Sequence, residues 1–214
     1  FPRSRRLEVF TKVCDAVGYA HAQGVLHRDL KPSNIMVGEH GEVYVVDWGI
    51  AVRIGHRDVP QAEQTLGPDF DTADLADERL TQDGDIIGTP AFMAPEQIRS
   101  EPLDERTDVY ALGVLLYTLI CDRPPFSGPT TTERVLRGNF VPPTAITTGV
   151  TWELEQIVLR AMSRAAGKRY PDVNALAADV KAFQSGDVLP GLRYPLLRRL
   201  SRQASRHWMP LAGA

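Results

Sequence analysis

Cysteine is scarce in this sequence, and its scarcity limits the covalent and metal chemistry of the chain. Only Cys14 and Cys121 occur among the 214 residues. Two cysteines are too few for a disulfide framework, and these two lack the spacing of metal ligands. We expect both to be buried, reduced thiols, as is usual in the cytoplasm.

A long hydrophobic run is also missing. The longest apolar run, at residues 109–121, is well short of the about 20 residues that a membrane-spanning helix requires. The first residues lead into an amphipathic pattern rather than the apolar stretch of a signal peptide, and no initiator methionine precedes them. We therefore predict a buried core helix at 109–121 and a cytoplasmic location for the chain.

Neither sign of charge dominates the composition. The formal net charge is −3 and the isoelectric point is about 6.0, so the chain has no overall basic field that would attract nucleic acid. Hydrophobic residues make up 43% of the chain, which is enough to bury a substantial core, and the length suits one domain or one large piece of a domain.

The spacing of the apolar residues predicts a largely helical chain. An amphipathic helix is expected over residues 5–23, with a stop at Gly24. Short β-type runs follow at 25–27, 35–37 and 43–46, and the turn at 38–41 suggests a hairpin. Later helical patterns occupy 107–121, 131–137, 152–162 and 173–184. We place His21 on the surface of the first helix and His40 in the turn.

Two segments have a biased composition. Residues 55–85 show no periodicity and are rich in Asp and Glu, which predicts a long mobile loop with a solvated acidic face rather than a metal site. After Asp187 the chain has no acidic residue. It gathers arginines instead, at Arg193, Arg198, Arg199, Arg202 and Arg206.

Residues 27–34, His-Arg-Asp-Leu-Lys-Pro-Ser-Asn, carry the chemistry of the chain. In a short loop after a strand, Asp29 can accept the proton of an attacking hydroxyl, and Asn34 can offer its amide oxygen to a metal ion. Lys31 can bring its positive charge to a transferring phosphate. Asp47 lies at the end of a later predicted strand, at 43–46.

These residues resemble the catalytic motifs of eukaryotic-type (Hanks-type) serine/threonine protein kinases. Residues 27–34 match the family's catalytic loop, Asp47-Trp48-Gly49 stands where the family has Asp-Phe-Gly, and residues 88–96 resemble the stretch that ends in Ala-Pro-Glu. The resemblance implies ATP with Mg²⁺ or Mn²⁺ as cofactors, and protein serine or threonine hydroxyls as substrates. We expect Trp48 to alter packing rather than metal binding.

The resemblance also assigns roles to single residues. It makes Asp29, Lys31 and Asn34 catalytic, Lys31, Ser33, Asn34 and Asp47 cofactor-binding, and Asn34 and Asp47 the metal ligands. His27 becomes a packing residue of the loop. Glu96 should pair with a buried Arg169, and Asp108 should accept backbone hydrogen bonds from the catalytic loop. Arg28 can receive a phosphate on the activation segment, for which the candidates are Thr65, Thr72, Thr81 and Thr89. Of these we favour Thr81, whereas Thr89 suits serine/threonine specificity.

The resemblance covers residues 5–185 and implies a mainly α fold: the C-terminal lobe of a protein kinase, with a small β-hairpin sheet at the catalytic loop. The family's N-terminal β-rich lobe is absent from the pattern, because no G-x-G-x-x-G loop and no Val-Ala-Ile-Lys-like strand occurs. We expect a partial kinase domain at 1–186, with an activation segment at 47–96 that contains the acidic insert 55–85. Residues 187–214 would form a basic tail.

Three interpretations of the function stay open. The parent protein is an active kinase, or the lobe belongs to a pseudokinase scaffold that binds protein partners, or the chain is a reading-frame fragment without a function of its own. Intact base and metal residues favour the first. The basic tail resembles the segment before the membrane span of bacterial receptor-like kinases, so we expect its arginines to contact an anionic membrane surface.

Overall fold

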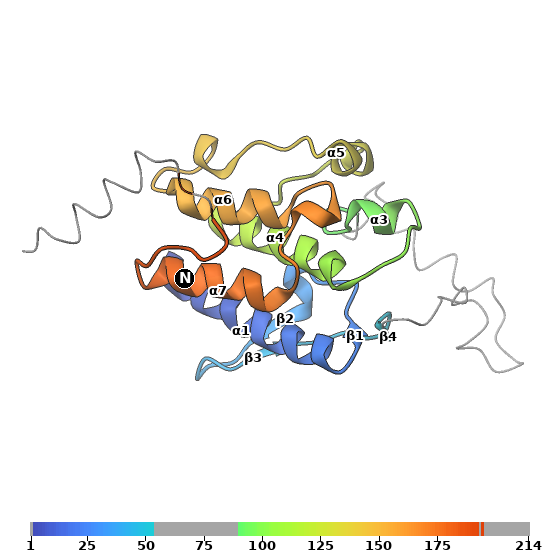
Figure 1. Cartoon of the computed structure of the whole chain (residues 1–214), viewed down its shortest axis with the longest axis horizontal. Coiled ribbons are helices and arrows are strands. Elements are labelled where there is room, and N and C mark those ends of the chain that lie inside the picture. The colour runs from blue at the N-terminus through green and yellow to red at the C-terminus, as the bar shows by residue number, and fades with distance from the viewer. Residues whose placement is uncertain (1, 54–89, 193, 195–214) are drawn as a thin grey trace, which may run out of the picture.

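Helices form most of the described chain, which comprises residues 2–53, 90–192 and 194 of a computed structural model (Figure 1). The first helix, α1, covers Arg3–Ala22. Gly24 follows it with φ +74°, a left-handed conformation that glycine adopts without strain and that commonly ends helices. The predicted helix and its stop are confirmed, and the helix begins slightly earlier than predicted.

Four later helices follow the predicted pattern closely: α4 (Glu105–Cys121), α5 (Thr131–Arg137), α6 (Trp152–Ala161) and α7 (Val173–Gln184). The short helix α3 (Pro95–Ile98) was not predicted. Short 3₁₀ turns lie between them: η1 (Pro32–Asn34), η3 (Pro143–Ala145) and η4 (Ala166–Lys168). Asp104 caps α4 by accepting the backbone N–H of Arg106 at 2.8 Å, which explains why α4 starts before the predicted residue 107.

Within the described residues, four short strands form two separate two-stranded sheets. β2 (Ile35–Val37) pairs antiparallel with β3 (Val43–Val45), which confirms the predicted hairpin. β1 (Val25–Leu26) pairs instead with β4 (Val52–Arg53), an antiparallel pairing that the sequence patterns did not predict. The loop between β1 and β2 is therefore held at both ends by paired strands.

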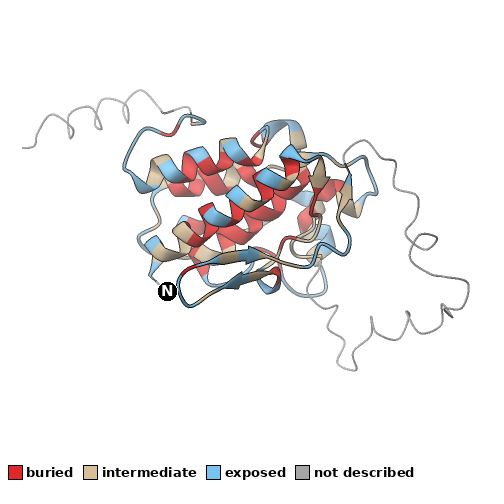
Figure 2. Cartoon of the chain, turned by 90° about the horizontal axis from the view of Figure 1, so that it is seen from below, coloured by how far each residue is buried: buried red, intermediate tan, exposed pale blue. Residues whose placement is uncertain are grey.

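The hydrophobic core is built around α4. Figure 2 shows buried residues continuing along the helices on their facing sides, and α4 packs against α1, α6 and α7. Gly113 lets α4 and α6 approach closely, since a Cβ atom there would lie 2.8 Å from the Cβ atom of Ala161. The predicted core helix at 109–121 is confirmed. Within the described ranges, no helix combines the length and apolar character needed to cross a membrane.

The structure also tests the smaller predictions. Cys14 and Cys121 are buried free thiols, as predicted, and burial raises the pKa of Cys14. The surface position predicted for His21 is wrong: only 7% of the residue is exposed, because the last turn of α1 packs against the start of α4. The predicted acidic loop at 55–85 lies outside the described residues.

Candidate active site

Three of the predicted site residues meet in the loop between β1 and β2. The ammonium group of Lys31 lies 2.7 Å from Oδ2 of Asp29. The amide nitrogen of Asn34 donates to the backbone carbonyl of Asp29 at 2.8 Å and to its Oδ2 at 3.2 Å. Two donors therefore reach the same carboxylate oxygen and hold the side chain of Asp29 in one orientation.

The same contacts orient Asn34. Its side chain is buried, and its Nδ2 atom faces Asp29, so Oδ1 points to the opposite side of the amide. Ser33 lies beside that oxygen, with its hydroxyl 3.4 Å from Oδ1. The Oδ1 atom is a neutral oxygen donor of the kind that Mg²⁺ accepts in proteins.

Asp47 is attached to this loop through the backbone. The N–H of Val46 donates to the carbonyl of Asn34 at 2.9 Å, so the residue just before Asp47 is fixed to the loop. Asp47 itself is exposed and has φ +62°, a left-handed conformation that aspartate tolerates better than most residues. Its carboxylate is the second candidate metal ligand.

The side chains of His27 and Trp48 pack against each other beside the loop that carries Asp29. The two rings lie 4.4 Å apart, and the indole N–H of Trp48 donates to the carbonyl of Val45 at 2.9 Å. Nδ1 of His27 accepts the N–H of Asp29 at 3.3 Å, which leaves Nε2 to donate to the carbonyl of Val46 at 3.2 Å. Both ring nitrogens are thus used in holding the loop, which is a packing role.

A buried carboxylate supports the loop from α4. Asp108 is fully buried and accepts the backbone N–H groups of His27 and Arg28, at 2.8 and 2.9 Å. Nε2 of His21 lies 2.8 Å from the same carboxylate. The contacts with these three partners thus offset the loss of hydration that the Asp108 carboxylate suffers on burial. The predicted contact between Asp108 and the loop is present, and His21 is a third partner that the motif did not reveal.

A buried ion pair joins α3 to the segment after α6. Arg169 donates to both carboxylate oxygens of Glu96, at 2.6 and 2.8 Å, as the predicted pairing requires. Thr107 donates its hydroxyl to the same carboxylate at 3.1 Å. Burial acts to raise the pKa of Glu96, but the hydrogen bonds and charge of Arg169 outweigh it and hold that pKa below its ordinary value.

Gln97 links α3 directly to the loop, and the motif comparison missed it. Its Oε1 atom accepts the N–H of Ala94 at 2.9 Å, and its Nε2 atom donates to the carbonyl of Arg28 at 2.8 Å. A Gln at the third position of a helix commonly reaches back to the residue before the helix, so the first contact could have been read from the sequence. The second contact depends on the tertiary fold.

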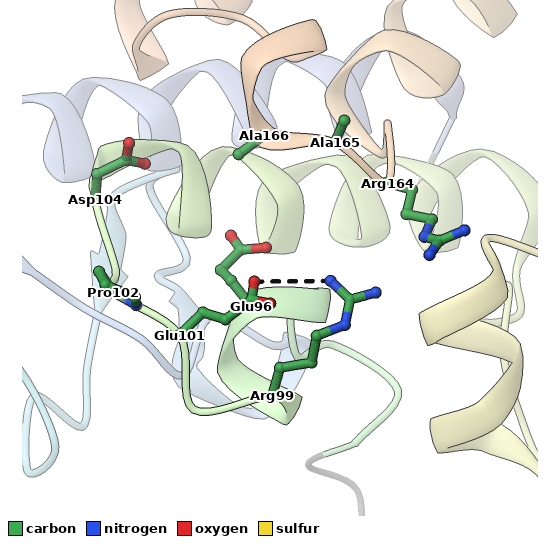
Figure 3. A pocket seen from close by; sticks show the side chains of 8 residues that line it. All are labelled: Glu96, Arg99, Glu101, Pro102, Asp104, Arg164, Ala165 and Ala166. Carbon is green, nitrogen blue, oxygen red and sulfur yellow. Dashed lines mark ion pairs between the residues drawn. The ribbon is translucent and has the colours of Figure 1, made fainter.

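A separate pocket of about 300 Å³ lies beside α3 (Figure 3). It is lined by Glu96, Arg99, Glu101, Pro102, Asp104, Arg164, Ala165 and Ala166. Arg99 and Glu101 lie 3.7 Å apart within it. Of the predicted site residues it shares only Glu96, so it is distinct from the place where Asp29, Lys31 and Asn34 meet.

The remaining predicted site residues lie outside the described residues. They are Thr65, Thr72, Thr81 and Thr89 of the activation segment, and the tail arginines Arg193, Arg198, Arg199, Arg202 and Arg206. Arg28 is described, with φ +71° and its backbone held by Asp108 and Gln97. This fixed backbone gives the Arg28 side chain a defined origin beside Asp29.

Comparison with known proteins identifies the family. The family model for the protein kinase domain matches residues 1–165. The chain is 34% identical to serine/threonine-protein kinase PknD of Chlamydia abortus over 182 residues, and 36% identical to PknD of Chlamydia caviae over 184 residues; each match covers 84% of this chain and 19% of the relative. PknD of Chlamydia pneumoniae is 33% identical over 205 residues, or 94% of this chain and 21% of the relative.

The chain thus spans about a fifth of the length of these bacterial kinases. The family match covers most of the chain and includes the loop that carries Asp29, Lys31 and Asn34, as well as Asp47. The chain belongs to the protein kinase domain family.

Proposed function

We propose that this chain forms the C-terminal lobe of a serine/threonine protein kinase and provides the catalytic half of its active site. The observation that carries the proposal is the convergence of Lys31 and Asn34 on one carboxylate oxygen of Asp29, at 2.7 and 3.2 Å. Phosphoryl transfer relies mainly on positioning and charge. A base, a cation and a metal ligand held together in one short loop meet that need.

Asp29 acts as the catalytic base in this proposal. Its carboxylate accepts the proton of the serine or threonine hydroxyl as the oxygen attacks the γ-phosphorus of ATP, and the bond from that phosphorus to the β-phosphate oxygen breaks, so that ADP leaves. Lys31 lies close enough to Asp29 to place its charge beside the phosphate that is being transferred. The contacts of His27 and Asp108 with the loop backbone keep the base in place.

Asn34 and Asp47 would hold the metal ion, with Ser33 next to the nucleotide. One amide oxygen and one carboxylate suit Mg²⁺ or Mn²⁺, because such ions in kinases complete their coordination with phosphate oxygens and water. When bound, the ion neutralises the charge that builds up on the phosphates. The backbone bond between Val46 and Asn34 keeps the two ligands on neighbouring segments.

An exposed apolar surface next to the site supports the assignment to the C-terminal lobe. Met36 and Tyr44 are cross-strand partners on the outer face of the hairpin, and each is 57% exposed. Trp48 and Ile50 are 36% and 37% exposed. An apolar surface of this kind beside a site typically receives a partner, and a strand-rich lobe that closes over ATP would cover it.

The test is phosphoryl transfer from ATP to a serine/threonine protein substrate. We expect transfer by a longer parent protein that includes a nucleotide-clamping lobe, complete loss in Asp29→Ala, and normal transfer in Asp15→Ala. Asp15 is a suitable control because it lies on α1 in an exposed pair with Lys181. Lack of transfer by an intact parent would favour the scaffold interpretation instead.

The isolated chain of 214 residues should bind ATP weakly and transfer negligible phosphate, because one wall of the nucleotide site is missing from the lobe. Transfer by this chain alone that disappears in Asp29→Ala would contradict the assignment to a single lobe.

Two regulatory features belong to the same proposal. A phosphate on Thr81 would pair with Arg28 and order the activation segment, and mass spectrometry of the active parent should find that segment modified. The tail arginines from Arg193 to Arg206 would bind anionic lipid. Liposome flotation should therefore weaken when residues 190–214 are deleted, and equal flotation would contradict this role.

A further inference from the structure

The chain does not leave the domain freely after α7. Gly186, with φ +73°, turns it back, and the N–H of Asp187 donates to the carbonyl of Ala182 at 2.8 Å. Figure 1 shows the chain passing from the end of α7 toward α6. Leu189 is only 1% exposed, so this exit segment, residues 187–192 and 194, packs against the folded domain.

The anchor of the exit segment is a buried carboxylate on α7. Asp179 is 1% exposed, and its Oδ2 accepts the hydroxyl of Tyr170 at 2.7 Å. Its Oδ1 accepts the backbone N–H of Gly191, also at 2.7 Å. A hydrogen bond to a charged, buried acceptor is among the stronger ones in proteins, and here its donor belongs to the exit segment.

Arg160 of α6 also contacts both Gly191 and Asp179. Its guanidinium group donates to the carbonyl of Gly191 at 2.5 Å and lies 4.0 Å from Oδ2 of Asp179. The group also stacks over the ring of Tyr170, 4.1 Å from its centre. Both backbone polar groups of Gly191 are therefore bound by side chains of the domain.

A side chain at position 191 would force Arg160 and Asp179 to move. A Cβ atom there would lie 2.2 Å from a guanidinium nitrogen of Arg160 and 2.4 Å from Oδ2 of Asp179. The segment beyond is held as well: the N–H of Leu189 donates to the hydroxyl of Tyr194 at 3.3 Å, and the rings of Tyr194 and Trp152 lie 5.8 Å apart.

We propose that the exit segment, residues 187–192 and 194, forms a latch, closed by Gly191 on Asp179, that fixes where and in which direction the chain leaves the kinase domain. The folded unit then extends to residue 194, past the residue 186 boundary expected from the kinase motifs. The arginine-rich sequence that follows starts from a fixed point beside α6 and α7. This inference does not depend on phosphoryl transfer.

Hydrogen–deuterium exchange of the full chain tests the latch. In the wild type, the amides of Leu189, Gly191 and Leu192 should be protected, although they lie outside any helix or strand. Gly191→Ala should open the latch by steric clash, and Asp179→Asn should weaken it by removing the charge. The hydrogen-exchange rates of the same three amides should rise by about ten-fold or more in each variant.

Gly167→Ala is the matched control, because no atom lies within 4 Å of the position a Cβ would take there. It should exchange like the wild type. In Gly191→Ala the amides of α4 should keep their protection. The proposal is overturned if Leu189, Gly191 and Leu192 exchange freely in the wild type, if Gly191→Ala leaves them protected, or if that variant loses protection throughout the domain.

Discussion

Arg169 and Glu96, which lie 73 positions apart in the sequence, form a bidentate ion pair with contacts of 2.6 and 2.8 Å. The side chain of Arg169 is fully buried and also donates to the carbonyls of Ser163 and Arg106, each at 2.8 Å. One guanidinium group thus joins α3, the start of α4 and the segment after α6. Because α3 contacts the loop that carries Asp29 through Gln97, the ion pair stabilises the candidate site from a distance.

Removing one member of this pair should be costly. Glu96→Ala leaves the buried charge of Arg169 without its partner, and the free energy of unfolding should fall by roughly 3–5 kcal/mol. Urea denaturation measures the change. The control is Glu101→Ala on the same segment, whose exposed pair with Arg99 at 3.7 Å should contribute about 1 kcal/mol or less. Equal losses in the two variants would contradict the structural role of Glu96.

The same pair predicts a loss of stability in acid. The pKa of Glu96 is lowered in the folded state, so its stabilising contribution is present above the unfolded-state pKa of about 4.3. It is lost as the pH falls through the lower folded value. The difference in melting temperature between the wild type and Glu96→Gln should therefore shrink from pH 7 to pH 3. A difference that stays constant would exclude this linkage.

Asp108 should matter for the loop more than any exposed aspartate. Asp108→Ala removes the acceptor for the backbone N–H groups of His27 and Arg28. The free energy of unfolding should fall by about 1–3 kcal/mol for each buried donor left without a partner. Hydrogen exchange at these two amides should accelerate. Asp122→Asn is the control, since the Asp122 side chain is 72% exposed. In this variant the amides of His27 and Arg28 should exchange as in the wild type.

Much of this fold was predictable because the helices have strong local signals. Gly24 ends α1, and the apolar run at 109–121 forms the core part of α4, both as expected. The hairpin was equally clear from its turn. The pairing of β1 with β4 was not, because two-residue strands carry almost no periodicity and their pairing depends on contacts distant in sequence.

The candidate site was likewise predictable only in part. Motif spacing predicted the residues that meet at Asp29, and it predicted the partners of Glu96 and Asp108. We predicted His21 on the surface of the first helix, and polar residues do usually face solvent. The buried carboxylate of Asp108 makes His21 an exception, with a contact of 2.8 Å, and only the packing of α1 on α4 reveals it.

The close packing of α4 and α6 gives an independent test of the core. A Cβ atom at residue 113 would also lie 2.9 Å from Cγ of Met162, so Gly113→Ala should force the helices apart and lower the free energy of unfolding by about 1–3 kcal/mol. Gly167→Ala, with open space around it, should change stability little. Calorimetry compares the two, and a neutral effect of Gly113→Ala would show that the core relaxes.

The most direct test of the catalytic assignment is the turnover number of Asp29→Asn in the parent kinase, measured beside the dissociation constant for ATP. The substitution keeps the size of the side chain and the backbone contact with Asn34 but removes the carboxylate proposed as the base. We expect kcat to fall by about 10²–10⁴-fold while the affinity for ATP is unchanged. An unchanged kcat would contradict it.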